Sequence, residues 1–326
     1  MTTIKTPSAE EALPIRLGIS TCLLGEKVRF DAGHKKDRYL TDVLGEYFEW
    51  VPVCPELEVG MGVPREAVRL VGPPDAPKMI GVKSARDWTE EMNGYSSGRM
   101  ASLRNLQLSG YIFKSDSPSC GMERVKVFAP NGIPMKNGRG LFTKIFMETF
   151  PLVPAEEEGR LNDPGLRENF IVRVFSYHRL QQLTSNRFSI GDLVRFHSTH
   201  KYLILAHSPK HYDLLGRIVA NAKQTPFASL RESYSKLFME GLSVKTTAKK
   251  NTNVLHHILG FLKEHLSSQE KQDVADSIED FRKELVPIVV PLTLLRHYVK
   301  KHQIVYIADQ VFLQPHPKEL MLRNHV

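Results

Sequence analysis

The sequence predicts an α/β N-terminal domain with a mainly parallel sheet, followed by a mostly α-helical C-terminal domain. Three observations predict this order. The chain of 326 residues is long enough for two hydrophobic cores. Its first half alternates strand-like runs with helix-compatible stretches, whereas apolar residues in the second half recur at three- and four-residue spacing. The polar stretch 154–165, which contains Pro and Gly, predicts the joint, so the expected domains are 1–155 and 156–326.

Short runs of β-forming residues predict the strands of the first domain, at 15–21, 48–53, 110–115 and 124–129. A polar stretch over 84–108 predicts a helix, and a glycine turn opens another over 137–150. In parallel sheets, ligands bind beyond the carboxyl ends of the strands. The three cysteines follow the first three strands, so we expect them at that edge.

Seven amphipathic stretches predict the helices of the second domain. They cover 166–183, 192–208, 211–222, 227–242, 253–266, 274–285 and 291–302.

The composition is that of an ordinary globular protein, with 41% hydrophobic and 25% charged residues. The first residues lack the basic start and apolar run of a signal peptide. No apolar stretch reaches the roughly 18 residues of a membrane span, and three cysteines are too few for a disulfide framework. We therefore expect a cytoplasmic protein that keeps its thiols reduced and has no membrane partner.

The positive charge lies in the second half. Residues 1–165 hold 21 Lys and Arg against 22 Asp and Glu, whereas residues 166–326 hold 23 against 14. This asymmetry predicts a nucleic-acid partner for the second half, and a merely solvated basic surface is the alternative. The segment 243–253 is expected to be a flexible loop whose Lys245, Lys249 and Lys250 contact RNA phosphates.

The only cysteines are Cys22, Cys54 and Cys120, spaced 32 and 66 residues apart. This spacing fits neither a close zinc ribbon nor a Cys-x-x-Cys redox pair. Each lies in a turn rich in Ser, Pro, Gly or acidic residues, where backbone N–H groups are free to bond sulfur. An iron–sulfur cluster needs such neighbours, although buried structural cysteines are the alternative. Three protein ligands on a four-iron cube leave one iron open.

The segments "STCLLGEKVRFDAGHK", "VPVCPELEVGMGVPRE" and "FKSDSPSCG" resemble the signature segments of the thiouracil desulfidase family, over roughly residues 14–155. The resemblance implies a 4Fe–4S cluster held by Cys22, Cys54 and Cys120. It also implies a redox-neutral hydrolysis that releases sulfide from a thiolated pyrimidine bound through its sulfur to the open iron. One departure is Val28, which stands where many relatives carry a further cysteine.

The segments 196–221, 249–266 and 291–302 resemble the YbgA-like domain, which often follows the desulfidase domain. In such fused proteins the resemblance implies 4-thiouridine compounds as substrates, with the added domain assisting the binding of thiolated tRNA. The substrate stays open among a free base, a nucleoside, a nucleotide and tRNA.

Four polar residues near the cysteines are candidate catalytic residues. Glu56 is our first choice for the general base that activates water, with helix capping or pairing with Arg65 as the alternative. Asp31 either shares that role or fixes its turn. Ser117 and Ser119 either bind the ring carbonyl and position the water or bond the local backbone.

Arg65 and Lys114 are candidate substrate-binding cations that meet a 5′-phosphate or offset the charge of the cluster. Surface salt bridges are the alternative for both. The four histidines between 197 and 211 are expected to pack or contact RNA rather than bind zinc. The competing function is a non-catalytic RNA-binding protein with a structural metal site. A thiol redox enzyme is less favoured because no close cysteine pair exists.

Overall fold

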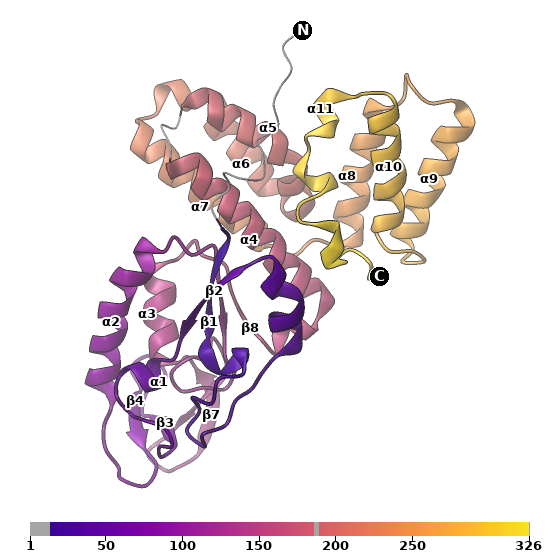
Figure 1. Ribbon diagram of the computed structural model, residues 1–326. Coiled ribbons are helices and arrows are strands. Elements are labelled where there is room, and N and C mark those ends of the chain that lie inside the picture. Colours follow the sequence, from indigo (N-terminus) through magenta and orange to yellow (C-terminus); the bar gives the residue numbers. More distant parts are fainter. Residues whose placement is uncertain (1–13, 186–188, 326) are drawn as a thin grey trace. The chain divides into compact units, whose positions relative to one another are not determined.

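The computed structural model describes residues 14–185 and 189–325. The chain divides into two compact units, Met1–Gly159 and Arg160–Val326. The first is α/β and the second helical, so the predicted fold class is confirmed (Figure 1). Within the described ranges, no helix is both long and apolar enough to cross a membrane.

The first unit is built on a four-stranded sheet in the order β2-β1-β5-β8, and all its strands are parallel. The strands are β1 (Arg16–Ser20), β2 (Glu49–Val53), β5 (Gly110–Phe113) and β8 (Ala155–Glu157). The first three were predicted. Every residue of β5 is buried, which explains why it reads as a short apolar run without alternation.

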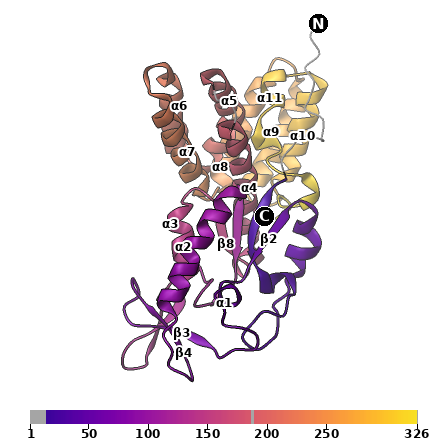
Figure 2. The same cartoon turned by 60° about the vertical axis from the view of Figure 1, so that its left-hand side comes forward.

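Two helices, α2 (Thr89–Asn105) and α3 (Leu141–Thr149), lie side by side against this sheet (Figures 1 and 2). Both lie inside the stretches expected to be helical. Met100 and Leu103 of α2 join Phe142 and Phe146 of α3 in one core with the aromatic rings of β5. This packing fixes the sheet whose carboxyl ends carry the cysteines.

A second sheet, in the order β4-β3-β6-β7, was not expected. Its strands are β3 (Val68–Val71), β4 (Lys78–Gly81), β6 (Val125–Phe128) and β7 (Pro134–Gly138). The run at 124–129 does form a strand, but β6 pairs with β3 and β7 rather than with the main sheet. The other three strands are short and bounded by Gly and Pro. These residues are typical of loops, so the sequence did not indicate strands there.

The expected joint over 154–165 begins with a strand. Ala155–Glu157 pair with Tyr111–Phe113 and complete the main sheet, and Arg160–Asn162 form a 3-10 turn. The first unit therefore extends to Gly159 rather than to residue 155. The acidic run of this strand gave no apolar signal, although its side chains are buried.

The second unit contains all seven predicted helices and one further short helix, α11 (Val305–Ala308). They are α4 (Pro164–Ser185), α5 (Ile190–His207), α6 (Pro209–Ala220), α7 (Phe227–Ser243), α8 (Ala248–Phe261), α9 (Ser268–Arg282) and α10 (Val289–Lys301). Ser189 and Ser267 each form a capping box that begins a helix. The expected loop over 243–253 is only half correct, because Thr247 caps a helix that begins at Ala248.

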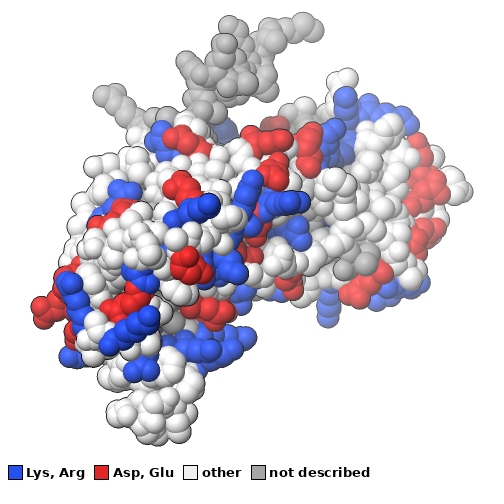
Figure 3. Space-filling model, turned by 60° about the horizontal axis from the view of Figure 1, so that its bottom comes forward, with Lys and Arg blue, Asp and Glu red and all other residues white. Residues whose placement is uncertain are grey.

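Charges of both signs intermingle on the surface that Figure 3 shows, without one large field of a single sign. On this face the positive side chains are therefore interspersed with negative ones.

Candidate active site

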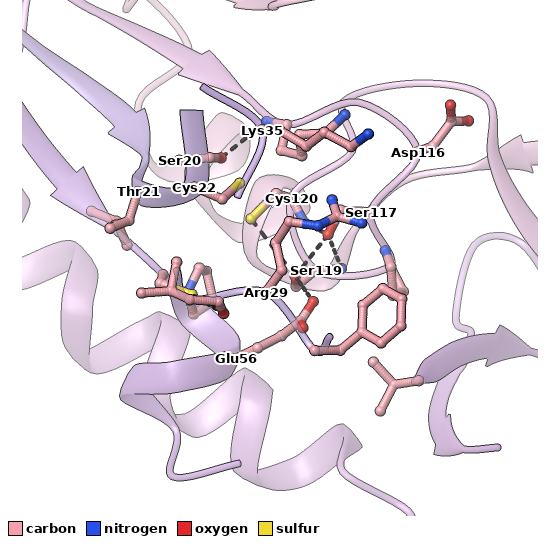
Figure 4. Close-up of a pocket in the computed structure, with 18 of the residues that line it drawn as sticks. Ser20, Thr21, Cys22, Arg29, Lys35, Glu56, Asp116, Ser117, Ser119 and Cys120 are labelled. Carbon is pink, nitrogen blue, oxygen red and sulfur yellow. Dashed lines mark hydrogen bonds between the residues drawn. The ribbon is translucent and has the colours of Figure 1, made fainter. Parts of the chain in front are cut away.

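The three cysteines meet at one cavity of about 490 Å³ in the first unit (Figure 4). Cys22 lies in the 3-10 turn Thr21–Leu24 directly after β1. Cys54 follows β2 and begins the short helix α1 (Pro55–Glu58). Cys120 lies in the turn after β5. The expectation that the cysteines gather at the carboxyl ends of the strands agrees with this arrangement.

The turn around Cys120 is held by the start of α3. The N–H groups of Leu141 and Phe142 donate to the carbonyls of Pro118 and Ser119, at 3.1 Å each. Gly140, just before the helix, allows this approach, because a Cβ there would lie 2.4 Å from the Ser119 carbonyl oxygen. The helix and the glycine turn that opens it thus position the third cysteine.

The thiols are protonated in the absence of a metal. Burial raises the pKa of Cys22 to about 11, and the neighbouring Cys54 raises it further while Lys114 opposes the rise. Burial is also the main cause of the raised pKa of Cys54 and of Cys120. A metal bound by these sulfurs would displace their protons and remove this cost.

The donor set consists of soft sulfur atoms, which suits iron better than magnesium or calcium. In the described part of the chain, no three His, Cys, Asp or Glu side chains are close enough together to hold a metal ion. The three thiols line the same cavity. Sulfur donors of this kind are the ligands that iron–sulfur clusters use, so the residues present are compatible with such a cluster.

Glu56 forms the most enclosed ion pair at the cavity. Arg65 Nε and Nη2 donate to Glu56 Oε2 at 3.1 and 2.6 Å, and the two side chains are only 5% and 13% exposed for Arg65 and Glu56. Arg65 Nη1 also donates to the carbonyls of Val28 and Gly62, at 3.0 and 2.9 Å. Arg65 lines the cavity, but every nitrogen of its guanidinium is thus engaged by Glu56 or the backbone.

A short chain of hydroxyls leads from Glu56 toward the Cys120 turn (Figure 4). Ser119 Oγ donates to Glu56 Oε1 at 2.6 Å and lies 2.9 Å from Ser117 Oγ. Ser117 Oγ accepts from the Cys120 N–H at 3.1 Å, and Ser119 Oγ lies 3.6 Å from the Cys120 sulfur. The serines therefore bond the backbone and also link the carboxylate to the cysteine.

Lys114 is tied to Glu158, a residue that the sequence reasoning missed. Lys114 Nζ donates to Glu158 Oε1 at 2.5 Å and to Ser115 Oγ at 2.9 Å. Glu158 Oε2 accepts from the Ser115 N–H at 2.7 Å. Because Glu158 follows β8, this pair joins two neighbouring strand ends at the cavity wall. Its sequence signal was the acidic run after residue 155.

Asp31 fixes its turn. Its Oδ1 accepts from the Gly33 N–H at 3.0 Å, and this bond lowers the pKa of the exposed carboxyl. Asp31 is not among the residues that line the cavity, although Arg29, its 3.5 Å ion-pair partner, is. The structure thus agrees with the turn interpretation, and a catalytic role for Asp31 stays a prediction.

Arg29 and Lys35 are further cations at the cavity that sequence reasoning did not single out. Both line the cavity and lie near Cys22 and Cys120 in Figure 4. They come from the segment between Cys22 and β2, whose basic composition was the signal that could have identified them.

In the second unit, the histidines between 197 and 211 serve packing. His200 stacks on Phe196 with ring centroids 4.0 Å apart, and His207 Nδ1–H donates to the Val244 carbonyl at 2.7 Å. Lys250 Nζ donates to the carbonyls of His207 and Lys245, at 2.8 and 3.1 Å, so it caps the end of α5. Lys245 and Lys249 are exposed.

Comparison with known proteins gives matches to both units. Residues 17–158 match the family described as 2-thiouracil desulfurase, and residues 201–317 match DUF1722, described as a family of unknown function. The uncharacterized protein YbgA of Escherichia coli (strain K12) is 28% identical over 158 residues, which cover 48% of this chain and 94% of YbgA. The uncharacterized protein YbbK of Bacillus subtilis (strain 168) is 29% identical over 108 residues, 32% of this chain and 71% of YbbK.

Among solved structures, a [4Fe-4S]-dependent thiouracil desulfidase, TudS, is similar at 24% identity with a TM-score of 0.38. The match covers 47% of this chain and 97% of TudS. The two resemblances expected from the sequence motifs are confirmed by the family matches. The chain is thus similar to the 2-thiouracil desulfurase family over residues 17–158 and to the DUF1722 family over residues 201–317.

Proposed function

We propose that the chain removes sulfur from a thiolated pyrimidine, replacing C=S by C=O with water and releasing sulfide. The carrying observation is that three cysteines, distant in sequence, line one cavity together with the Glu56–Ser119 pair. The match to the 2-thiouracil desulfurase family supports this reaction class. The cavity of about 490 Å³ lies within the range that small-molecule sites occupy.

The proposed cofactor is a 4Fe–4S cluster held by Cys22, Cys54 and Cys120, with one iron left open. When bound, it would supply a soft Lewis acid for the sulfur of the substrate. The three thiols provide the ligands, and the Ser119 hydroxyl, which lies 3.6 Å from the Cys120 sulfur, provides a donor of the kind that such a cluster needs.

Glu56 is the proposed general base. Arg65 holds one carboxylate oxygen, so the other, Oε1, faces Ser119 and is the one that receives a proton from water. Ser119 and Ser117 orient this oxygen and the attacking water. The net reaction consumes one water and releases one hydrogen sulfide, with no change in oxidation state.

Arg29 and Lys35 are the proposed contacts for a phosphorylated substrate. Arg65 and Lys114 were the predicted cations, but their donors are engaged by Glu56 and Glu158. Arg29 and Lys35 line the same cavity; Arg29 pairs only with the exposed Asp31, at 3.5 Å, and Lys35 forms no ion pair with any residue that the structure describes. A nucleotide is therefore expected to bind better than the free base.

The test is anaerobic reconstitution followed by a sulfide-release assay on 2-thiouracil, 4-thiouracil, 4-thiouridine, its 5′-monophosphate and thiolated tRNA. We expect a brown protein with about four irons per chain. Iron and activity should both be lost in Cys22→Ala, Cys54→Ala and Cys120→Ala. A colourless protein that binds RNA but releases no sulfide would instead support the non-catalytic RNA-binding alternative.

A further inference from the structure

Buried carboxylates end the last strand of the main sheet. Glu156 and Glu157 of β8 are only 5% and 6% exposed, and Glu158, whose side chain is 13% exposed, follows them. Acidic side chains are rarely buried unless they are paired or hydrogen-bonded. The partners of Glu157 and Glu158 therefore show which part of the fold these carboxylates stabilise.

Glu157 holds the returning end of the loop that carries Cys120. We define this loop as residues 114–123, which directly follow β5. Glu157 Oε1 accepts from the N–H of Met122 at 2.7 Å and from that of Glu123 at 3.3 Å. In the part of the chain that the structure describes, Glu157 forms no ion pair with Lys, Arg or His. Its carboxylate is therefore committed to the main chain of the loop.

Glu158 holds the other end of the same loop. Its Oε2 accepts from the Ser115 N–H at 2.7 Å, and its Oε1 accepts from Ser115 Oγ at 2.8 Å and from the Lys114 ammonium. Successive side chains of an extended strand point to opposite faces, so the two neighbouring carboxylates reach different parts of the loop. The loop is thereby tied at both ends to the end of β8.

Cys120 lies between these two ends, close to the one that Glu157 holds. Its own N–H donates to Ser117 Oγ inside the loop, at 3.1 Å. Two residues further on, the Met122 carbonyl accepts from Arg139 Nε at 3.0 Å, while the Met122 N–H donates to Glu157. Because bonds to a charged acceptor are among the stronger hydrogen bonds, this end of the loop should open more often without the Glu157 carboxylate.

We infer that Glu157 is a positioning residue for Cys120, because its carboxylate fixes the end of the loop two residues after the sulfur. Glu157 is not among the residues that line the cavity, so it acts on the site through the backbone of the loop. The inference rests on the proposed function only in treating Cys120 as a ligand of the cluster. It gives the acidic end of β8 a part in building the site.

The test is timed alkylation of the cluster-free full chain by iodoacetamide. Trypsin places each cysteine in a different peptide, so mass spectrometry follows the three thiols separately. A buried thiol reacts when its segment opens, so its rate reports local opening. In Glu157→Leu, which lacks the acceptor, Cys120 should react about 10- to 150-fold faster than in the wild type. Glu157→Gln keeps an amide oxygen for the two N–H groups, and Cys120 should react at nearly the wild-type rate.

Cys22 and Cys54 are the internal controls in the same samples. A general loss of stability would raise all three rates together, because global unfolding exposes every thiol, whereas loss of a positioning contact raises the rate of Cys120 alone. Glu148→Leu removes an exposed carboxylate of α3 and should change none of the three rates. Circular dichroism melting verifies that each variant is folded, and Glu157→Ala replaces Glu157→Leu if the leucine variant does not fold.

Anaerobic reconstitution gives a second readout. Iron content should fall below about four per chain in Glu157→Leu and be retained in Glu157→Gln. An unchanged Cys120 rate in folded Glu157→Leu, or an equal rise at all three cysteines, would overturn the inference. So would full iron content despite faster alkylation of Cys120. A wild-type chain that binds no iron would instead overturn the proposed cluster, and the alkylation rates would still decide whether Glu157 positions Cys120.

Discussion

Glu56 lies at the centre of the smallest network that the proposed reaction needs. One of its oxygens accepts two bonds from Arg65 and the other accepts one from Ser119. The carboxylate is fixed in orientation, and its charge is balanced by a guanidinium that is itself almost fully buried. The same residue is therefore structural and, by our proposal, catalytic, so its two roles must be separated by measurement.

The variant Glu56→Gln should separate the structural role of Glu56 from its proposed catalytic role. The amide can still accept from Ser119 but cannot take a proton, so the rate of sulfide release should fall by roughly 10²- to 10⁴-fold with iron content retained. Arg65 is left buried without a counter-charge, which should cost about 3–5 kcal/mol of unfolding free energy. Rates are measured below the lowered melting temperature. Glu49→Gln breaks the exposed Arg16 pair and is the control, with an expected cost under about 1 kcal/mol.

A wild-type rate in folded Glu56→Gln would remove Glu56 as the general base while leaving its ion pair in place. Loss of iron from the variant would instead show that the network supports the cluster site.

Glu158→Gln should destabilise the cavity wall for a related reason. It leaves the half-buried Lys114 ammonium without its carboxylate and replaces a charged acceptor for Ser115 by a neutral one. We expect a loss of about 3 kcal/mol in chemical denaturation, much of it recovered in the double variant Lys114→Met/Glu158→Gln, where no charge is stranded. If the losses of unfolding free energy in the two single variants simply added up in the double variant, the two side chains would not depend on each other.

Among the residues of the site, the cysteines were predictable, pairing of Glu56 with Arg65 was one of the alternatives considered for Glu56, and the Lys114–Glu158 pair was not foreseen. A rare residue type that recurs in similar turns can be recognised from the few residues that surround it in the sequence. The partners of Arg65 and Lys114 lie 9 and 44 residues away in sequence, and only the fold brings Glu158 to Lys114. Arg65 and Lys114 were correctly placed at the cavity, but their exposure could not be inferred from their charge.

At the scale of elements, the close contact between β1 and β5 is set by a glycine. Gly18 pairs with Tyr111, and a Cβ on Gly18 would lie 2.1 Å from a carbon of the Tyr111 ring. That ring cannot move aside, because it stacks on Phe113 at 4.1 Å and contacts Phe146 at 4.7 Å. The strand that precedes Cys22 thus depends on a residue without a side chain.

Gly18→Ala should therefore destabilise the first unit by about 1–3 kcal/mol or more through overpacking. Gly98→Ala in α2 is the matched control, because nothing lies within 4 Å of its added Cβ and alanine favours the helix by about 1 kcal/mol. Denaturant titrations of the two variants should shift in opposite directions. A neutral Gly18→Ala would show that the Tyr111 ring has room to yield.

The predictability of the elements follows their physical signal. Helices with regular apolar spacing, as in α4 to α10, were placed correctly, and so were the apolar strands β1, β2 and β5. The strands β3, β4 and β7 are short and contain or adjoin Gly or Pro, and β8 is an acidic run. Their identity comes from pairing with distant strands, which local composition does not encode.

For the whole molecule, the uneven distribution of histidine has a thermodynamic consequence. Twelve of the 13 histidines follow residue 165. Burial lowers the pKa of His197, His207 and His316 to about 4 and that of His200 to about 3. Their ordinary pKa is 6.5, so the unfolded chain binds protons at a higher pH than the folded unit does.

Acid should therefore unfold the second unit before the first. The stability that neutral histidines contribute is fully present above pH 6.5 and is lost as the pH falls toward 4, by about 1.4 kcal/mol per pH unit for each histidine. The first unit has only one histidine, His34. The pKa values of its carboxyls Asp31 and Glu66 are lowered, so protonation of these two groups affects its stability only below about pH 4. Both tryptophans, Trp50 and Trp88, lie in the first unit, so fluorescence reports on it while circular dichroism reports mainly on the helical second unit.

On titration from pH 7.5 to 4, the helical signal should melt at progressively lower temperature while the tryptophan transition changes less. His207→Asn keeps a donor for the Val244 carbonyl and removes one titrating ring, so its melting temperature should depend less steeply on pH. His34→Gln, an exposed position, should leave both transitions unchanged. Coincident loss of the two signals in acid would show that the units unfold together and that the buried histidines do not set the acid limit.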